Sequence, residues 1–507
     1  MIDIVNAVLA QASTRPDEVA IVDKDGAVTT FGELRDRILA VRDGLRAQGL
    51  GSGDGVLFAV RTSATGIALF LGVLAAGGVL ITADTAVGPE LVAARMREYR
   101  PRWLIAESIL YPASVFRPMR SLCRRRGWSV PDLRQPIADP TIRHVYSGRW
   151  LPGVPGGAIK AGDLSGPATA PEVDLDAPAL VVFTSGTTSR PKGVVHTLRT
   201  LTTGMQLLAS HFPFVPGDAM HTDVIVAALP ALVSGARLSL TTASPERFAK
   251  DLTERAVTHA YGVPVQLAEV FEVLPKWPEH VRYLLMGSAP AAPAVLRQAM
   301  NAVPDGQVLS VYAMTEVLPI AVGRAEDKLA HTEQGRPGDL LGPPSDGVDV
   351  RIAEDGELMV TGPNVCRGYL GDPPMTELPT GDLARLDDRS RIIMLGRKKD
   401  MLIRGSYNIY PGLYEPSIAL LPGVREAAMV GLPDPVTEDE TVVLAVVADD
   451  GVDVQALTRR LRKQLPDIID AEAVPDRIVV LDELPRSGRS RKLDRPALRA
   501  VLAGRTT

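Results

Sequence analysis

An apolar run that leads into a turn rich in hydroxyl groups constrains this chain most. Residues Ala179–Phe183 predict a buried strand, and Thr184–Gly193 follows with the sequence Thr-Ser-Gly-Thr-Thr-Ser-Arg-Pro-Lys-Gly. Such a turn offers backbone N–H groups and hydroxyls to an anion, and Lys192 adds a positive charge. It is not a Walker A loop, because Pro191 stands where that motif has its second glycine. A polar surface turn would explain the glycines and the proline but not five hydroxyls and a lysine behind a strand, so the stretch predicts phosphate binding.

Helical and strand patterns alternate over most of the chain, which predicts parallel α/β layers. Expected helices cover residues 3–14, 32–48, 89–99 and 198–211, and expected strands cover 54–60, 103–106 and 179–183. The uncharged stretch 62–83 divides at Gly77-Gly78 into a helix and a short strand, so we favour a buried helix–turn–strand unit over a membrane span. Residues 110–171 are rich in proline, glycine and arginine and predict a variable connection.

The pattern changes after Gly335. Residues 348–360 alternate like an antiparallel meander, with Glu354-Asp355-Gly356 as its hairpin turn. Residues 391–395 predict one more strand, and a charged turn follows at 396–400. A compact C-terminal piece comes next, with helices near 413–420 and 453–464 and strands at 427–430, 442–447 and 478–481. We therefore predict two domains, 1–395 and 396–507, with the charged turn as the hinge.

Composition narrows the class of protein. A chain of 507 residues with 46% hydrophobic and 23% charged residues is typical of a soluble globular protein with large cores. The net charge of -5 argues against nucleic acid as a partner. Only two cysteines occur, Cys123 and Cys366, which excludes a disulfide framework and suits a reducing cytosol. No signal peptide is visible at the N-terminus, so we expect a cytoplasmic protein without a membrane span.

A series of motifs in a fixed order matches one family. The chain resembles the ANL superfamily of adenylate-forming enzymes, which includes acyl-CoA synthetases, peptide-synthetase adenylation domains and luciferases. The matching stretches are Thr30–Leu34, Gly72–Gly78, Thr184–Gly193, Tyr261–Pro264, Tyr312–Glu316, Thr380–Leu383, Gly396–Asp400 and Ile403–Pro411. The resemblance implies an α/β fold: a large N-terminal domain of layered α/β sheets with a small β-barrel-like part, plus a small mobile α+β C-terminal lid domain.

The resemblance also implies a reaction. Such enzymes join a carboxylate to the α-phosphorus of ATP, release pyrophosphate and form an acyl adenylate. A carboxylate is a poor electrophile, and the mixed anhydride with AMP supplies a good leaving group. Preorganised hydrogen-bond donors and a cation lower the barrier to bringing two anions together. The expected cofactors are therefore ATP and Mg²⁺.

Motif positions imply the site residues. Donors around the triphosphate would be Thr184, Ser185, Gly186, Thr187, Thr188 and Lys192. Glu316 would hold Mg²⁺, Tyr312 would stack on adenine, and Asp382 would accept hydrogen bonds from the ribose hydroxyls. Arg397 would reach the ribose or the phosphates. The remaining nucleotide contacts would come from Gly287, Ser288, Ala289, Ala313, Met314 and Thr315. Thr184, Lys192, Glu316 and Lys492 are the predicted catalytic residues.

Lys492 stands in a tail that departs from the family pattern. A lysine near the C-terminus of these enzymes contacts the carboxylate and the α-phosphate during adenylation. Here the usual Ser-Gly-Lys triplet is replaced by Ser490-Arg491-Lys492, and the preceding loop is one residue longer. Arg489 or Arg491 would then share the role, and a merely basic tail is the alternative interpretation.

The acceptor of the acyl group is less constrained. Residues 403–411 resemble the acyl-CoA synthetase branch, which favours transfer to a thiol of CoA or of phosphopantetheine on an acyl carrier protein. The Leu-Pro-x-x-His signature of that branch is absent from Leu229–Val233, and residues 315–319 and 224–237 resemble β-lactone synthetases. In those enzymes the substrate's own hydroxyl attacks the adenylate, with the advantage of proximity. A catalytically silent nucleotide binder is the third alternative.

Small and apolar residues dominate the regions expected to form the acyl pocket, 221–230, 261–265 and 287–290. They indicate an aliphatic, fatty or otherwise hydrophobic carboxylic acid as the substrate. Asp223 leaves an amino acid substrate open, because an ammonium group needs a carboxylate partner. His196 and His221 lie near the site, and each alone is interpreted as structural.

Overall fold

The structure is a computed structural model that describes residues 2–82, 99, 101–116, 119, 133, 142–168, 174–184, 192–242, 244–404, 407–433, 440–487 and 491–504. The chain divides into two compact units. The first comprises residues 1–242, 314–318 and 363–376. The second comprises residues 243–313, 319–362 and 377–507.

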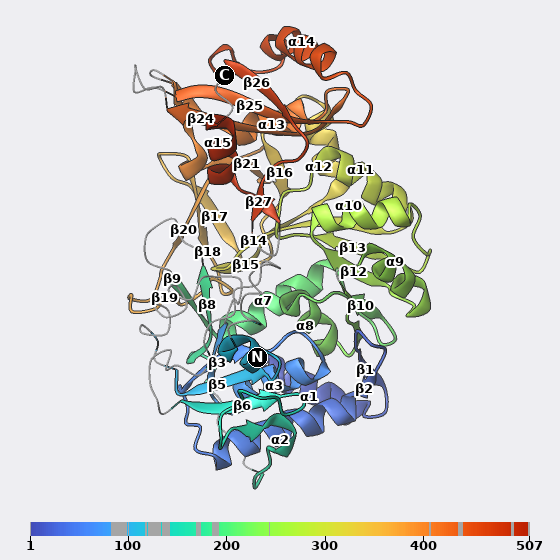
Figure 1. Ribbon diagram of the computed structural model, residues 1–507, viewed down its shortest axis with the longest axis vertical. Coiled ribbons are helices and arrows are strands. Elements are labelled where there is room, and N and C mark those ends of the chain that lie inside the picture. The colour runs from blue at the N-terminus through green and yellow to red at the C-terminus, as the bar shows by residue number, and fades with distance from the viewer. Residues whose placement is uncertain are drawn as a thin grey trace. The chain divides into compact units, whose positions relative to one another are not determined.

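The main sheet of the first unit has eight strands in the order β19-β9-β8-β4-β3-β5-β6-β7 (Figure 1). The strands are β3 (Gly55–Ala59), β4 (Val79–Thr82), β5 (Trp103–Glu107), β6 (Arg143–Ser147), β7 (Ile159–Lys160), β8 (Pro178–Thr184), β9 (Lys192–Thr197) and β19 (Gly368–Tyr369). Strands β8, β4, β3, β5, β6 and β7 pair in parallel, whereas β9 pairs antiparallel with both β8 and β19. Leu57, Ile81 and Val181 belong to its core. The expected strands at 54–60, 103–106 and 179–183 are confirmed.

The expected variable connection at 110–171 is wrong in part. A short helix, α5 (Leu110–Val115), begins it, and β6 and β7 extend the parallel sheet. Strand β6 buries only Val145 and Tyr146 between more exposed neighbours, so its apolar pattern is too short to stand out in the sequence. The expected helix at 89–99 lies outside the described residues except for Tyr99.

The longer helices of the first unit, apart from the one at 225–233, begin at residues whose side chains cap them. They are α1 (Ile4–Thr14), α2 (Phe31–Ala47), α3 (Ala64–Ala75), α7 (Leu198–His211) and α8 (Ile225–Val233). Thr30 and Glu33 form a capping box at the start of α2, and Thr197 and Thr200 form one at α7. Gly72 lets α3 approach α2 closely, because a Cβ there would lie 2.5 Å from Val41 Cγ1. The predicted helices at 3–14, 32–48 and 198–211 are confirmed.

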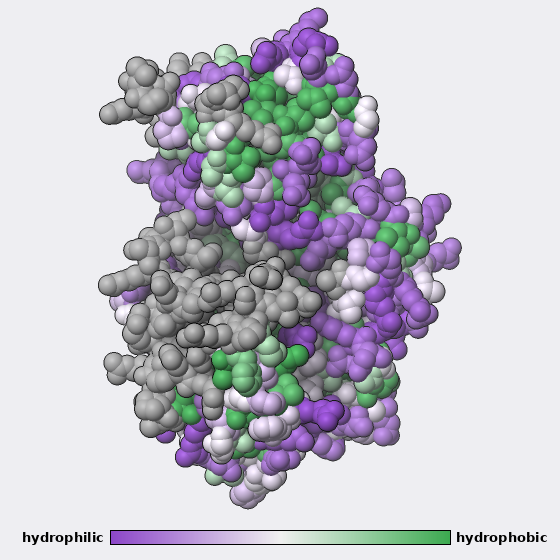
Figure 2. Space-filling view, in the orientation of Figure 1, coloured by the Kyte–Doolittle hydropathy of each residue, from purple (hydrophilic) through white to green (hydrophobic). Residues whose placement is uncertain are grey.

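The described part of the uncharged stretch, residues 62–82, contains no membrane span. It folds into α3, which has 12 residues, and then β4. Within the part of the chain that the structure describes, no helix is long and apolar enough to cross a membrane. Figure 2 shows hydrophilic side chains over most of the described surface on one face.

Parallel strands and helices also build the start of the second unit. Strands β12 (His259–Gly262), β13 (Tyr283–Met286) and β14 (Gln307–Met314) pair in parallel, and β15 (Val317–Arg324) follows β14 in the chain. The helices are α9 (Pro245–Glu254), α10 (Pro264–Val273), α11 (Pro293–Ala302) and α12 (Ala325–Glu333). Proline opens three of these helices, where its missing N–H has no partner to lose.

A five-stranded antiparallel sheet follows, in the order β16-β21-β20-β18-β17. Its strands are β16 (Asp339–Gly342), β17 (Asp349–Ile352), β18 (Glu357–Thr361), β20 (Leu378–Leu386) and β21 (Ile392–Arg397). The predicted meander and its turn are confirmed, since β17 and β18 pair antiparallel and Gly356 has a φ of 85°. The expectation of a small β-barrel-like part stays a prediction, since this sheet is an open row of five strands.

The C-terminal piece is an α+β layer. Its main elements are α13 (Pro411–Ile418), β24 (Val424–Pro433), β25 (Glu440–Ala448), α14 (Val454–Gln464), β26 (Arg477–Leu481) and α15 (Arg495–Ala503). Alternate residues of β25 enter two different cores. Leu444 packs in the core that includes Leu461 of α14, and Ala445 in the core that includes Leu498 of α15. The chain thus has the predicted mixed α/β fold with a small C-terminal part, while the domain boundary near residue 395 stays a prediction.

Candidate active site

The predicted phosphate loop joins two antiparallel strands. Strand β8 ends at Thr184 and β9 begins at Lys192, and these two residues pair across the hairpin. Residues 185–191, which include Ser185, Gly186, Thr187 and Thr188, lie outside the described residues. The strand expected before the loop is confirmed, and phosphate binding by the loop stays a prediction.

Tyr369 connects the predicted phosphate-loop lysine to the predicted metal ligand. It lies in β19 and pairs with Val194 of β9. The Lys192 ammonium is 4.6 Å from the centroid of its ring. The Tyr369 hydroxyl donates a hydrogen bond of 3.1 Å to Glu316 Oε1. Burial and the Glu316 carboxylate raise the pKa of Tyr369, so the hydroxyl keeps its proton.

Tyr369 lies outside every sequence motif that matches the family. A single tyrosine outside the motifs carries no signal, and its two partners lie far away in the chain. In the structure β19 pairs with β9. This pairing brings Tyr369 close to the start of the strand that follows the phosphate loop.

Backbone contacts hold the turn that carries Glu316. The Glu316 carbonyl accepts a hydrogen bond of 2.7 Å from the Cys366 N–H. The His196 ring meets the Thr315 carbonyl at 2.7 Å through Nε2 and the Thr200 hydroxyl at 3.1 Å through Nδ1. Because a carbonyl only accepts, Nε2 carries the proton. Burial lowers the pKa of His196, so the ring is neutral and has a structural position.

The donor set at Glu316 fits magnesium brought in with a nucleotide. The residue is only 7% exposed, and its Oε2 has no hydrogen-bond partner among the described residues. Across the described part of the chain, no group of three or more His, Cys, Asp or Glu side chains is arranged to hold a metal. Mg²⁺ commonly takes one or two carboxylates and completes its shell with phosphate oxygens and water.

The predicted nucleoside residues form a second group, in the second unit. The Tyr312 hydroxyl donates a hydrogen bond of 2.6 Å to Asp382 Oδ2, and Arg397 Nε lies 3.3 Å from Asp382 Oδ1. Asp382 and Arg397 pair across β20 and β21. Burial raises the pKa of Asp382, against the opposing effect of Arg397 and Tyr312. A buried carboxylate with both oxygens engaged is thus held in a fixed orientation.

Gly287, Ser288 and Ala289 follow β13 in a strained turn. Ser288 has a φ of 67°, a region that L-residues rarely occupy. Its Oγ lies 2.9 Å from the Tyr261 hydroxyl. A Cβ at Gly287 would lie 2.9 Å from the same hydroxyl, so a larger residue there would require the Tyr261 side chain to shift. Backbone strain of this kind clusters at functional sites.

Lys492 shares an electrostatic environment with the nucleoside group. It begins β28 (Lys492–Leu493), which pairs with β27 (Arg486–Ser487). Although the residue is exposed in part, burial and then the Arg397 charge lower its pKa, while Asp382 opposes them. Lys492, Arg397 and Asp382 are therefore near enough to interact.

Arg491, the predicted rival of Lys492, is engaged elsewhere. Its Nη1 donates to Glu269 Oε1 of α10 at 2.6 Å. Arg489 lies outside the described residues. The structure therefore distinguishes Lys492 from its basic neighbour by the groups that face each.

Two polar residues of the expected acyl region contact other protein side chains. His221 lies fully buried in β10 (Ala219–His221), with Nδ1 2.9 Å from Ser239 Oγ of β11 (Arg237–Ser239). Asp223 is exposed and lies 4.0 Å from the Lys24 ammonium. An exposed carboxylate beside a lysine is a poor partner for a buried ammonium.

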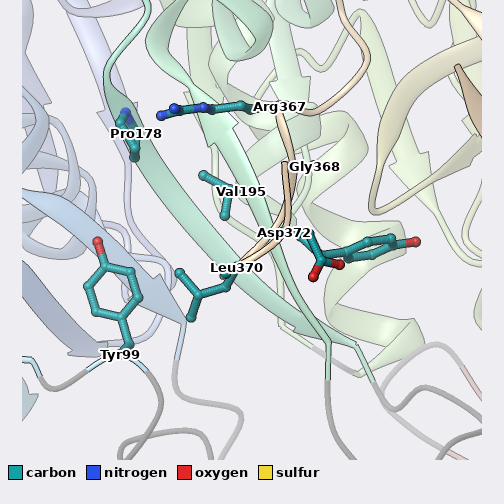
Figure 3. A pocket seen from close by; sticks show the side chains of 9 residues that line it. Tyr99, Pro178, Val195, Arg367, Gly368, Leu370 and Asp372 are labelled. Atoms are coloured by element: carbon teal, nitrogen blue, oxygen red, sulfur yellow. The ribbon is translucent and has the colours of Figure 1, made fainter. Parts of the chain in front are cut away.

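A cavity of about 220 Å³ lies beside β8, β9 and β19 (Figure 3). Figure 3 shows Val195 of β9 and Leu370 among its lining side chains. Arg367 and Asp372 supply its charged groups, and Tyr369 also lines it. The ring that contacts Lys192 thus borders open space rather than a closed core.

Comparisons with known proteins agree with the motifs. The family profile described as AMP-binding enzyme matches residues 8–370, and the one described as AMP-binding enzyme C-terminal domain matches residues 414–492. The chain is 29% identical to feruloyl-CoA synthase of an Amycolatopsis species, over 92% of this chain and 93% of that protein. It is 24% identical to medium-chain fatty-acid–CoA ligase of Escherichia coli K12, over 98% and 90%.

Solved structures show the same fold. An amide bond synthetase of Marinactinospora thermotolerans aligns with a TM-score of 0.81 at 23% identity, over 98% of this chain and 99% of that one. The o-succinylbenzoate CoA synthetase of Bacillus subtilis, solved with an acyl-adenylate intermediate, aligns with a TM-score of 0.75 at 22% identity, over 97% of each chain. With the family profile covering most of its length, this chain belongs to the AMP-binding enzymes of the ANL adenylate-forming superfamily and is an AMP-forming ligase.

Proposed function

We propose that this enzyme activates a hydrophobic carboxylic acid with ATP and transfers the acyl group to the thiol of CoA. The observation that carries the proposal is the group formed by Tyr312, Asp382, Arg397 and Lys492. In this group the buried Asp382 carboxylate is suited to bind ribose hydroxyls, and Lys492 is suited to bind a phosphate and a carboxylate. Family membership supplies the reaction class.

In the first half-reaction a substrate carboxylate oxygen attacks the α-phosphorus of ATP. The bond from the α-phosphorus to the bridging oxygen breaks, and pyrophosphate leaves with the electron pair. Lys492 would neutralise charge on the carboxylate and the α-phosphate, because an ammonium aimed at developing charge stabilises the transition state. Asp382 would hold the ribose, and Arg397 would reach the ribose or the phosphates.

The residues of the first unit would hold the triphosphate end. Lys192 and the loop after Thr184 would donate to the phosphates, and Glu316 would hold Mg²⁺. The cation, when bound, neutralises phosphate charge. Glu316 is buried and oriented by Tyr369, which supports this assignment. Ala313, Met314 and Thr315 would complete the contacts along the same strand and turn.

In the second half-reaction the thiol sulfur attacks the acyl carbonyl, the thiol gives up its proton, and AMP leaves. Relatives named as CoA ligases match over more than nine-tenths of the chain, which supports CoA over an intramolecular hydroxyl as the acceptor. The thiol of a carrier-protein phosphopantetheine has the same chemistry. We further propose that residues 396–507 form a lid domain that turns about the charged turn at 396–400 between the two steps.

The proposed substrate class rests on the apolar composition of α8 and on the exposed position of Asp223. Helix α8 is apolar along its length, and residues such as Ala228 and Leu232 are buried. Because Asp223 is exposed and lies beside Lys24, no buried carboxylate in this stretch awaits an amino group. This supports a hydrophobic acid and disfavours an amino acid.

The test is a product assay with ATP, Mg²⁺ and a panel of aliphatic, aromatic and 3-hydroxy acids, with and without CoA. Acid-dependent pyrophosphate release, followed by AMP release that requires CoA, supports the proposal. A cyclic product from a 3-hydroxy acid without CoA would instead show a β-lactone synthetase. Complete silence across the panel, with ATP still bound, would show a silent nucleotide binder. Lys463→Ala, at an exposed lysine of α14, is the matched control for Lys492→Ala.

A further inference from the structure

Tyr369 contacts a positive and a negative group at the same time. Its ring face meets the Lys192 ammonium at 4.6 Å from the centroid, and its hydroxyl binds Glu316 Oε1 at 3.1 Å. The two charged side chains come from different segments, since Lys192 begins β9 and Glu316 lies in the turn between β14 and β15. One aromatic side chain therefore connects the two groups assigned to the phosphates and to the cation.

The geometry keeps these opposite charges from neutralising one another. The structure describes both Lys192 and Glu316, and it shows no ion pair between them. A direct pair would hide the ammonium from phosphate and the carboxylate from a cation. With Tyr369 between them, the ammonium is stabilised by the electron-rich ring face and the carboxylate by a hydroxyl. Because the ring and the hydroxyl are neutral, Lys192 and Glu316 both keep the charge that would attract a ligand.

Packing does not explain the side chain. Tyr369 is half-buried and lines the cavity of about 220 Å³, so its ring is not enclosed on all sides. Backbone pairing of β19 with β9 would persist with another residue there. The distinguishing features of tyrosine at this position are the hydroxyl and the ring face, and both meet proposed ligand-binding groups.

We propose that Tyr369 is a positioning residue that holds Lys192 and Glu316 apart and oriented for the magnesium complex of a nucleoside triphosphate. Its hydroxyl occupies Oε1 of Glu316 and leaves Oε2 to the cation. Its ring restricts the long Lys192 side chain at the start of β9. This inference rests on the proposed function.

Two substitutions separate the hydroxyl from the ring. Tyr369→Phe keeps the ring and loses the hydrogen bond, and the Mg²⁺ concentration for half-maximal pyrophosphate release should rise about tenfold, the low end for losing a partner of a metal ligand. Tyr369→Leu loses the ring face as well and frees Lys192 to pair with Glu316. We expect the same Mg²⁺ effect together with a KM for ATP raised about threefold.

Tyr414→Phe is the matched control. The Tyr414 hydroxyl also donates to a carboxylate, Asp470 Oδ2, at 2.6 Å, and neither residue is assigned to the nucleotide or the cation. It should leave the Mg²⁺ dependence within about twofold of the wild type, because no metal ligand loses a partner. A merely structural role for Tyr369 would lower the melting temperature of its variants and leave their Mg²⁺ dependence unchanged, which would overturn the inference.

A binding measurement decides the matter independently of turnover. ATP is titrated calorimetrically into each variant across a series of Mg²⁺ concentrations. If the wild type binds Mg·ATP and Tyr369→Phe needs about tenfold more Mg²⁺, the inference stands whether or not pyrophosphate is released. If the wild type releases pyrophosphate and Tyr369→Phe behaves identically in both assays, the inference fails and the proposed function stands. If the wild type does not bind Mg·ATP, both fail.

Discussion

Replacing Asp382 with asparagine is expected to stabilise the protein at neutral pH and to weaken ATP binding. The side chain is 7% exposed, and burial raises the pKa of Asp382 despite its contacts with Arg397 and Tyr312. A raised pKa means that folding disfavours the ionised form. Asparagine has nearly the same shape and can still accept the hydrogen bond from the Tyr312 hydroxyl.

The magnitude follows from three contributions. Burying the carboxylate costs several kcal/mol, roughly 3. The charge strengthens the bond from Tyr312 by about 1 kcal/mol over a neutral acceptor. The pair with Arg397, whose side chain is 45% exposed, returns about 0.5 kcal/mol. Asparagine should therefore recover about 1.5 kcal/mol, which corresponds to an increase in melting temperature of about 2 °C or more.

The stability difference between the wild type and Asp382→Asn should change with pH in one direction. Below the ordinary aspartate pKa of 3.8 the carboxyl is protonated in both the folded and the unfolded state, so the stability gap between the wild type and the Asp382→Asn variant should be smallest there. As the pH rises through the folded-state pKa, the wild type loses stability relative to Asp382→Asn. Differential scanning calorimetry between about pH 4 and 8 measures the gap, which should widen with pH and then level off.

Asp387→Asn is the control of opposite sign. Although burial opposes them, hydrogen bonds from the Arg391 backbone and side chain and from the Arg389 N–H lower the pKa of Asp387. Its asparagine variant should be less stable at neutral pH, and that deficit should vanish as the pH falls through the folded-state pKa. Asp382→Asn should also raise the KM for ATP at least about tenfold, since the ribose loses a charged acceptor. A destabilised Asp382→Asn protein, or a gap that does not change with pH, would refute the reasoning.

Three further predictions concern other buried or charged groups. Lys492→Ala should lower acid-dependent pyrophosphate release at least about a hundredfold while ATP affinity by calorimetry changes less than about threefold; equal losses in both would contradict a transition-state role. His196→Leu should lower the free energy of unfolding by about 2 kcal/mol, because the Thr315 carbonyl loses its partner, and an unchanged urea midpoint would contradict this. Burial raises the pKa of Cys366 to about 11, so in a Cys123→Ser background its alkylation at about pH 8 should be about a hundredfold slower in the native than in the unfolded protein. Equal rates by mass spectrometry would show that the thiol is accessible.

Local signals in the sequence predicted most helices and strands of the described chain. The helix at 198–211 has the predicted bounds because Thr197 and Thr200 cap it and its apolar face repeats with helical spacing. Strands such as β25 are recognisable because an unbroken apolar run of its length is buried on both faces. Strands β6 and β7 were not predicted. Short strands at the side of a sheet depend on pairing with a neighbouring strand, which the local sequence does not reveal.

Motifs identified site residues but not the partners of those residues. Tyr312 and Asp382 were both predicted, yet they are 70 residues apart, and only the fold shows that one donates to the other. Tyr369 and Glu316 are 53 residues apart, and Tyr369 belonged to no predicted site. The direction of a pKa shift also cannot be predicted from the local sequence. Nothing local distinguishes Asp382, whose pKa is raised, from Asp387, whose pKa is lowered.

The tail shows how surroundings, rather than charge, separate neighbouring residues. Arg491 and Lys492 are both basic, and the sequence left either as a contributor to adenylation. Arg491 has a φ of 45°, which costs a non-glycine residue about 1 kcal/mol. Its exposed pair with Glu269 returns up to about 1 kcal/mol, which offsets the strain that the glycine of related enzymes would avoid. Arg491 thus pairs with α10, whereas burial and then the Arg397 charge lower the pKa of its neighbour Lys492, and Asp382 opposes them. Both side chains are exposed, so the charged groups near each, rather than burial, favour Lys492 as the residue that meets the substrate.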